Sequence, residues 1–197
     1  PEKDCEWGIF DYSQQEPRIV VHYASMKHFT GADKFVDSYR QDDSTDFHKM
    51  VSEIADIPRK KAKTINLGLF YGMGKGKLMS QLGINLEDAT EMLANYNERV
   101  PFVKQLMNDT MNKASKKGYL STIEGRRCRF ELYEPTNEWG QKALPFKEAK
   151  DEYGEHMIKR AFTYKALNRL IQGSAADQTK KAMLELSKEG YLAHIQV

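Results

Sequence analysis

The stretch at residues 59–74 constrains the fold of this chain more than any other part of the sequence. It predicts a helix over 58–72, because Pro58 stands just before the first turn, where a missing N–H costs nothing. Apolar residues recur at helical spacing and form a face that can be buried. These residues are Ala62, Ile65, Leu69 and Phe70. Gly68 and Gly72 lack side chains near the apolar end, which lets another part of the protein approach closely.

A second stripe on the same helix carries positive charge at one end and an aromatic ring at the other. It consists of Arg59, Lys63, Leu67 and Tyr71, each four residues after the last. Each step advances about 6 Å along the axis and turns by about 40°, so the stripe is about 18 Å long. A charged tail followed by a flat, apolar end is also the shape of a nucleoside triphosphate. The alternative interpretation is an amphipathic helix with a solvated basic face, and spacing alone favours it.

Composition indicates a globular chain. With 197 residues it can bury about 70% of its unfolded surface, which suffices for one domain or two small lobes. The formal net charge of +2 excludes nothing, but Lys and Arg gather in clusters that are either solvated faces or a DNA footprint. These clusters lie at 59–63, 113–117, 126–129 and 159–169.

The cysteine count and the hydropathy pattern exclude several other classes. Two cysteines, Cys5 and Cys128, form neither a disulfide framework nor a zinc site, which is typical of a reducing compartment. No apolar run approaches the ~20 residues of a membrane span, and no signal peptide is found. We therefore expect a cytoplasmic protein without a membrane partner. The chain starts with Pro1, which suggests a piece of a longer protein.

The helix at 58–72 closely resembles motif B, the nucleotide-binding helix of family A DNA polymerases, which include bacterial polymerase I and phage replicases. The residues that carry this resemblance are Arg59, Lys63, Asn66, Gly68, Tyr71 and Gly72. It implies that Arg59 and Lys63 hold the incoming triphosphate and that Tyr71 supports the nascent base pair. Lys63 is also implied to protonate the leaving pyrophosphate, as a catalytic residue. Leu67 is part of the same nucleotide-binding set, although the family commonly has Phe or Tyr there.

A second resemblance lies near the start of the chain. Residues 7–11 predict a short buried strand with a carboxylate at its end, and the following run resembles motif A of the same family. The matching residues are Asp11, Tyr12, Ser13, Gln14, Glu16 and Arg18. The resemblance implies that Asp11 binds two catalytic Mg²⁺ ions and that the Tyr12 carbonyl ligates one of them. Gln14 and Glu16 are implied to bind the nucleotide, with Glu16 excluding a ribose 2′-hydroxyl.

Three further segments extend the resemblance. His48, in Asp46-Phe47-His48, is implied to approach the triphosphate. A hairpin predicted at 118–133 matches a family signature, and its Arg126 and Arg127 are implied to contact the primer–template backbone. Asn168 and Gln172 fall one helical turn apart, so both amides can face a DNA minor groove.

The remaining elements follow from caps and periodicity. We expect helices over 19–26 and 34–40, from Asn85 to about Asn97, from Pro101 to Gly118 and over 153–187 with an interruption at Gly173. We expect a loop with one short helix at 134–154 and a strand at 191–197.

The resemblance implies an α+β, mostly helical fold: the fingers and part of the palm of a right-hand polymerase. Palm residues are expected at 1–26 and 156–197, and fingers at 27–155. Motif C, whose carboxylate completes the metal site, is expected beyond residue 197. We therefore expect a DNA polymerase that is inactive as this isolated fragment. We also expect a phage or other viral source, with the host cytoplasm as the location. Its partners would be primer–template DNA, dNTP and the rest of the polymerase, and a processivity factor is a further candidate. The alternatives are a single-subunit phage-type RNA polymerase, against which Glu16 argues, and a non-catalytic DNA-binding fragment.

Overall fold

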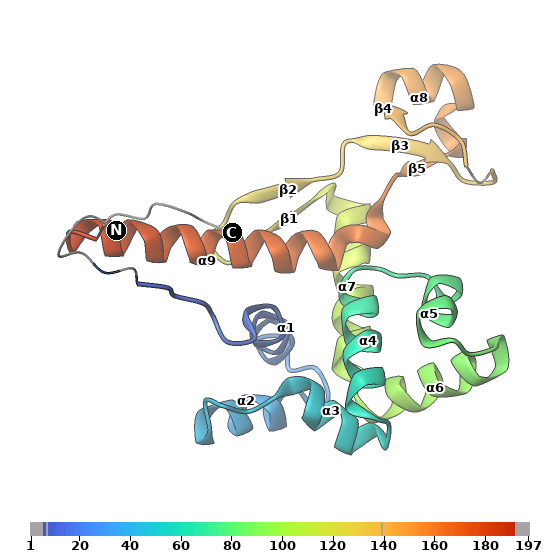
Figure 1. Ribbon diagram of the computed structural model, residues 1–197. Helices are drawn as coiled ribbons and strands as arrows, with labels where there is room; N and C mark the ends of the chain where they lie inside the picture. Colours follow the sequence, from blue (N-terminus) through green and yellow to red (C-terminus); the bar gives the residue numbers. More distant parts are fainter. Residues whose placement is uncertain (1–5, 7, 139, 192–197) are drawn as a thin grey trace.

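The computed structural model describes residue 6, residues 8–138 and residues 140–191. Helices make up most of this part of the chain (Figure 1). They are α1 (Gln15–Ser25), α2 (Ala32–Gln41), α3 (Phe47–Ala55), α4 (Arg59–Phe70), α5 (Lys75–Leu82), α6 (Leu86–Arg99), α7 (Pro101–Lys117), α8 (Phe146–Tyr153) and α9 (Ala166–Lys188), with short 3-10 turns η1 (Glu155–Met157) and η2 (Thr163–Lys165). None of the described helices is long and apolar enough to cross a membrane.

Two small antiparallel sheets complete the described fold. Strands β1 (Tyr119–Ser121) and β2 (Arg127–Arg129) form a hairpin in which Leu120 lies opposite Cys128. Strand β3 (Leu132–Pro135) lies between β4 (Leu144–Pro145) and β5 (Ile158–Arg160). The predicted mostly helical α+β class is thus confirmed.

Helix boundaries follow the capping signals in the sequence. Pro58 precedes α4, as predicted. The Asn85 side chain accepts a hydrogen bond from the Asp88 amide at the start of α6. Helix α7 begins at Pro101 and ends before Gly118, whose φ of +77° is the left-handed conformation expected at a helix end.

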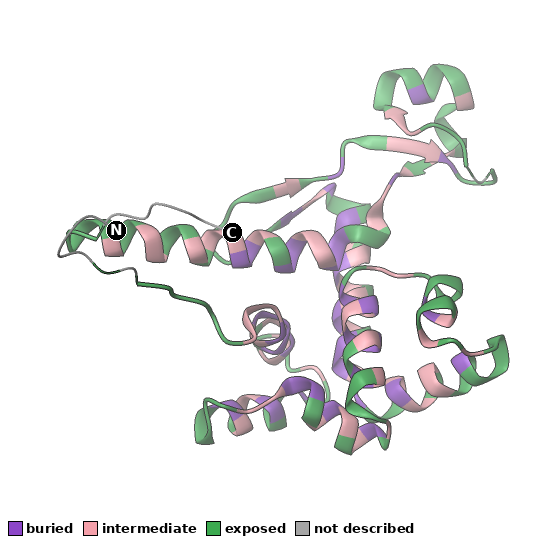
Figure 2. Ribbon diagram, in the orientation of Figure 1, coloured by how far each residue is buried: buried purple, intermediate pink, exposed green. Residues whose placement is uncertain are grey.

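Aromatic rings fill the centre of the helical core. The Phe47 ring lies 5.2 Å from that of Phe35, 5.9 Å from Phe70 and 6.4 Å from Phe102, in tilted and edge-on arrangements. Buried residues concentrate where α1, α3, α4, α7 and α9 come together (Figure 2). Helix α9 contacts α1 and α7 on one side and the β1–β2 hairpin on the other. Helix α9 therefore connects the helical core to the β1–β2 hairpin.

The structure corrects the prediction that α9 begins at 153 and breaks at Gly173. The helix begins at Ala166 and continues through Gly173 without interruption. A Cβ atom at this glycine would lie 2.9 Å from Thr122 Cγ2 in the hairpin turn. Gly173 is therefore needed for close packing between two elements, and not for a helix end.

The segment predicted as a loop at 134–154 is more ordered than expected. It contributes part of β3, then β4 and α8, and Figure 1 shows these elements with β5 as a unit projecting from the helical core. The Tyr133 ring packs 5.0 Å from that of Phe146. The short helix was predicted, but the strands were missed, because strands of two to four residues are too short to show an alternating pattern.

The buried strand predicted at 7–11 is wrong for its described residues. Residues 8–11 form no strand, and the Ile9 and Phe10 side chains are 93% and 76% exposed. A strand needs a neighbour to pair its backbone groups, and none of the described strands lies alongside this segment. Trp7, and the strand predicted at 191–197 apart from Tyr191, lie outside the described residues.

Candidate functional site

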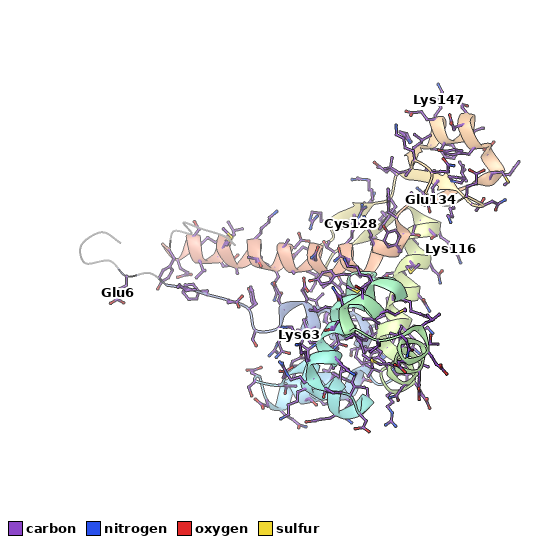
Figure 3. The ribbon with its side chains drawn as sticks, turned by 45° about the vertical axis from the view of Figure 1, so that its right-hand side comes forward. Glu6, Lys63, Lys116, Cys128, Glu134 and Lys147 are labelled. Carbon is purple, nitrogen blue, oxygen red and sulfur yellow. The ribbon has the colours of Figure 1, made fainter. Side chains whose placement is uncertain are left out.

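Helix α4 presents the predicted stripe on its open side. Its other side is buried through residues such as Ala62, Ile65 and Phe70. Arg59 and Lys63 are exposed, and Tyr71, just after the helix, is 38% exposed. Figure 3 labels Lys63. Charge at one end and a ring at the other are thus accessible along one helix, as the spacing predicts.

Asp46 connects α3 to the charged end of α4. Its Oδ1 accepts hydrogen bonds from the backbone amides of His48 and Lys49, at 2.9 and 3.1 Å, and so caps α3. Its Oδ2 accepts from Arg59 Nε at 2.9 Å and Nη2 at 2.5 Å. Burial by itself raises the pKa of Asp46, but the hydrogen bonds from Arg59 and the helix amides outweigh it and hold that pKa below its usual range. One carboxylate therefore orients the guanidinium and caps the neighbouring helix.

Replacing Asp46 separates these two roles. Asp46→Ala should lower the free energy of unfolding by about 1 kcal/mol through the lost cap, whereas Asp46→Asn should retain most of it, because an amide oxygen accepts the same backbone hydrogen bonds. The exposed ion pair itself adds little. The pKa of Asp46 is lower in the folded state than in the unfolded state. The stabilisation that depends on the Asp46 charge is therefore present above about pH 4 and is lost as the pH falls through the pKa of the folded state. Urea unfolding of both variants measures the difference, and equal destabilisation by Asn and Ala would contradict the capping role.

His48 lies beside the two cations of the stripe. Its side chain is almost fully buried, and its Nδ1 lies 2.9 Å from the Asn66 amide nitrogen. Burial is the main cause of the lowered pKa of His48; Asp46 raises it, and Arg59 and Lys63 lower it. His48 is therefore within electrostatic reach of both cations that the resemblance assigns to a triphosphate.

The aromatic end of the stripe meets the predicted sugar gate. The Tyr71 hydroxyl donates a hydrogen bond of 2.8 Å to Glu16 Oε2 on α1. Burial and this carboxylate raise the pKa of Tyr71, while a hydrogen bond with Gln172 of α9 lowers it. Side chains from three elements far apart in sequence therefore meet at the end of α4.

Gly72 allows the chain to turn at this point. Its φ is +65°, and a Cβ there would lie 2.5 Å from the backbone oxygen of Tyr164 in η2. The close approach expected at this glycine is confirmed, and its neighbour is main chain, which cannot move aside as a flexible side chain can.

Gln14 has a structural position. Its Nε2 donates to the Thr45 carbonyl at 2.7 Å, and its Oε1 accepts from the Phe47 amide at 2.8 Å. Both ends of the amide therefore hold the start of α3 against the start of α1. Any contact with a nucleotide would compete with these hydrogen bonds.

Asp11 and Tyr12 lie in the exposed segment before α1. Within 6, 8–138 and 140–191, no three His, Cys, Asp or Glu side chains gather as a metal site. The Asp11 carboxylate and the Tyr12 carbonyl are the hard oxygen ligands that Mg²⁺ takes, but they do not by themselves form a cage for a strongly hydrated ion.

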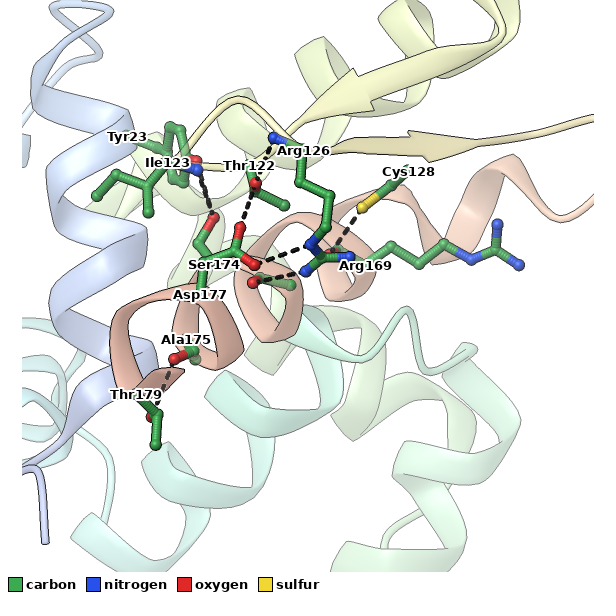
Figure 4. Close-up of polar contacts among 11 residues, drawn as sticks. Tyr23, Thr122, Ile123, Arg126, Cys128, Arg169, Ser174, Ala175, Asp177 and Thr179 are labelled. Carbon is green, nitrogen blue, oxygen red and sulfur yellow. Dashed lines mark hydrogen bonds and ion pairs between the residues drawn. The ribbon is translucent and has the colours of Figure 1, made fainter. Parts of the chain in front are cut away.

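The hairpin is fastened to α9 through Arg126 and Asp177 (Figure 4). Arg126 Nε donates to Asp177 Oδ1 at 2.8 Å, and Nη2 donates to the Gly173 carbonyl at 2.9 Å. The Thr122 hydroxyl donates to the other oxygen of Asp177. Both arginines are exposed. Arg126 binds α9, whereas the Arg127 guanidinium lies 4.7 Å from the centre of the Tyr119 ring.

The two amides predicted to face DNA both lie on α9. Asn168 is half-buried, and Gln172, one turn later, is exposed beside Tyr71. Sequence reasoning missed the contributions of Asp46 to Arg59 and of Tyr96 to Asn66. The capping role of Asp46 could have been predicted, because Asp is a preferred capping residue and stands directly before a helix.

A solved structure shares this fold. The solved structure of the POL domain of Pol1 from M. smegmatis, in complex with DNA primer-template and dNTP, matches with a TM-score of 0.66 and 28% sequence identity, over 91% of this chain and 30% of that chain. The DNA-directed DNA polymerase of Pseudomonas phage M6 is 35% identical over 100% of this chain and 32% of its own length. DNA polymerase I of Geobacillus stearothermophilus is 32% identical over 92% of this chain and 19% of its own length.

The family model for DNA polymerase family A matches residues 1–196 of this chain. The chain belongs to DNA polymerase family A, and the resemblance inferred from motifs A and B is confirmed. The chain spans only 32% and 19% of the phage and Geobacillus relatives. The domain boundaries and the individual site residues stay predictions.

Proposed function

We propose that the parent protein is a template-directed DNA polymerase that transfers a deoxynucleotide from dNTP to a primer 3′-hydroxyl. The observation that carries this proposal is the arrangement along α4: Arg59, Lys63 and His48 at one end, and Tyr71 hydrogen-bonded to Glu16 at the other. In this arrangement the cations bind the triphosphate and offset its charge, and Tyr71 supports the new base pair.

Lys63 is the residue proposed to assist departure of pyrophosphate. An exposed ammonium beside the triphosphate stabilises the negative charge that develops on the leaving group and can donate a proton to it. Arg59 binds as a planar fork, and its present partner Asp46 holds that fork in place through Nε and Nη2.

Polymerases of this family are generally metal-dependent. We propose that Asp11 and the Tyr12 carbonyl contribute ligands to two Mg²⁺ ions and that other parts of the parent protein complete their coordination. When bound, such ions activate the attacking hydroxyl and neutralise the departing phosphates.

DNA contacts are proposed for the hairpin and for α9. Arg127 offers charge to the primer–template backbone, which gives affinity without sequence preference. Arg126 can add to that charge while it holds the hairpin on Asp177. Asn168 and Gln172 are proposed to contact the minor groove, where base acceptors are similar for every correct pair.

Primer extension by the full-length protein tests the proposed function. We expect extension of a primed DNA template that requires dNTP and a divalent cation. Faster extension with rNTP than with dNTP would instead indicate an RNA polymerase. Binding of primer–template without extension would indicate a non-catalytic DNA-binding protein.

Glu16→Ala should relax the choice of sugar. Removing the carboxylate opens space next to Tyr71, and we expect relative incorporation of rNTP to rise on the order of tenfold to a hundredfold, which is the range that exclusion of one hydroxyl by shape provides. The ratio of kcat/KM for rNTP and dNTP measures it. Glu16→Gln is the matched control, because it keeps the bulk and can still accept from Tyr71. Unchanged selectivity in Glu16→Ala would remove Glu16 from the proposed gate.

A further inference from the structure

A buried chain of hydrogen bonds runs from α6 through α4 to the histidine of the site. The Tyr96 hydroxyl of α6 lies 2.5 Å from Asn66 Oδ1 on α4, and Asn66 Nδ2 lies 2.9 Å from His48 Nδ1 on α3. Tyr96 and Asn66 are 0% exposed, and His48 is 8% exposed. Three polar groups are therefore kept in a helical core, where each must be hydrogen-bonded to be tolerated.

Only one donor-to-acceptor direction along these hydrogen bonds satisfies all of the buried polar groups. An amide oxygen can only accept, so the Tyr96 hydroxyl donates to Asn66 Oδ1. Rotating the amide by 180° would place its NH₂ against Tyr96 and leave the hydroxyl proton without an acceptor, because the Tyr96 hydroxyl has no other hydrogen-bond partner in the described part of the chain. The amide NH₂ therefore faces His48 Nδ1, which must accept.

We propose that Tyr96 and Asn66 are positioning residues that hold His48 as the neutral Nε2–H tautomer, so that it offers one N–H donor beside Arg59 and Lys63. The acceptor would be a phosphate oxygen of the incoming nucleotide, and only that part rests on the proposed function. Tyr96 touches no reacting group itself; it acts by fixing the Asn66 amide, and through it the position of the proton on the ring.

The surroundings of the ring agree with a neutral histidine. Burial lowers the pKa of His48, and Arg59 and Lys63 add to the effect, against the opposing carboxylate of Asp46. The Phe47 ring lies edge-on at 5.9 Å. Protonation of Nδ1 would also direct its N–H at the Asn66 NH₂, so a doubly protonated ring loses the hydrogen bond that the neutral ring makes.

Nitrogen-15 NMR of the histidine rings tests the tautomer directly in the 197-residue chain. The chain has five histidines, and a His48→Gln variant identifies the signals of His48. We expect Nδ1 to have the shift of an unprotonated nitrogen and Nε2 that of an N–H at about pH 7 and above. An Nδ1–H tautomer or an imidazolium at pH 7 would overturn the proposal.

Tyr96→Phe tests the positioning role with a minimal change. Without the hydroxyl donor the Asn66 amide can turn over, and the tautomer ratio should shift toward Nδ1–H by roughly fivefold, the size of one neutral hydrogen bond. Tyr39→Phe is the matched control, because the buried Tyr39 hydroxyl has no hydrogen-bond partner. A spectrum of Tyr96→Phe identical to that of Tyr39→Phe would overturn the role of Tyr96.

Asn66→Asp provides a second variant. Its carboxylate can accept but not donate toward the ring, so the proton should move to Nδ1 and the pKa of His48 should rise. A ring that keeps an unprotonated Nδ1 in this variant would contradict the proposed direction of the chain.

The functional consequence is measured separately in the full-length polymerase. Tyr96→Phe should raise KM for dNTP roughly threefold to tenfold with a smaller change in kcat, because a binding contact is misaligned. Unchanged kinetics together with the expected NMR shift would overturn the phosphate contact of His48. Absence of primer extension by the unmodified protein would instead refute the proposed function and leave the tautomer result standing.

Discussion

Replacing Lys63 by methionine in the full-length polymerase should reduce the rate of nucleotide incorporation by about two to three orders of magnitude. Removing one preorganised donor from a site of developing charge typically has this effect, and charge-stabilising side chains in phosphoryl transfer reach it or exceed it. Lys63 is exposed on the open face of α4 and lies within electrostatic reach of His48. Single-turnover extension of a primed template at saturating dNTP measures the chemical step.

Lys60→Met is the matched control for this prediction. Lys60 is exposed on the same helix but is not part of the stripe, and its removal changes the net charge by the same amount. We expect Lys60→Met to change the rate less than about threefold. Similar losses in both variants would show that α4 acts through its overall charge, and would remove Lys63 from its proposed catalytic role.

Gly72→Ala should lower the free energy of unfolding by about 2–5 kcal/mol. Two costs add: a left-handed conformation costs an L-residue about 1–2 kcal/mol, and overpacking in a tight contact costs about 1–3 kcal/mol. The second cost arises because the new Cβ would lie 2.5 Å from the Tyr164 carbonyl oxygen, at a φ of +65°. Urea unfolding of the 197-residue chain measures the change.

Gly83→Ala separates the two costs. Gly83 has the same φ of +65°, but no heavy atom lies within 4 Å of its Cβ position. It should therefore carry the conformational cost alone, about 1–2 kcal/mol. Equal destabilisation at both positions would contradict the close contact between the end of α4 and η2.

The helices and their ends were predictable because their signals are local. A proline before α4, an asparagine before α6 and a glycine after α7 each satisfy or terminate backbone hydrogen bonding within one turn. The β1–β2 hairpin was predictable for the same reason, since its strands are adjacent and its turn contains Gly125 with a φ of +82°.

Longer-range pairing was not predictable. Strand β3 pairs with β5 across an intervening helix, and each is too short for an alternating pattern. The prediction that Gly173 interrupts α9 was wrong, because the contact that requires a glycine there is with Thr122, on another element. The segment at 8–11 has the composition of a strand but is exposed, since pairing depends on a neighbour and not on composition.

The amino-acid sequence alone determined that α4 would present two cations and a ring on one face, because helical spacing places every fourth residue nearly in line. Motif residues also determined the family. Only the tertiary structure decided which groups hold the side chains of α4 and of Tyr71 just after it. Asp46 is hydrogen-bonded to Arg59, Glu16 to Tyr71, and Tyr96 to Asn66. Hydrogen bonds between distant elements depend on how helices pack in three dimensions, and no local pattern in the chain records that packing.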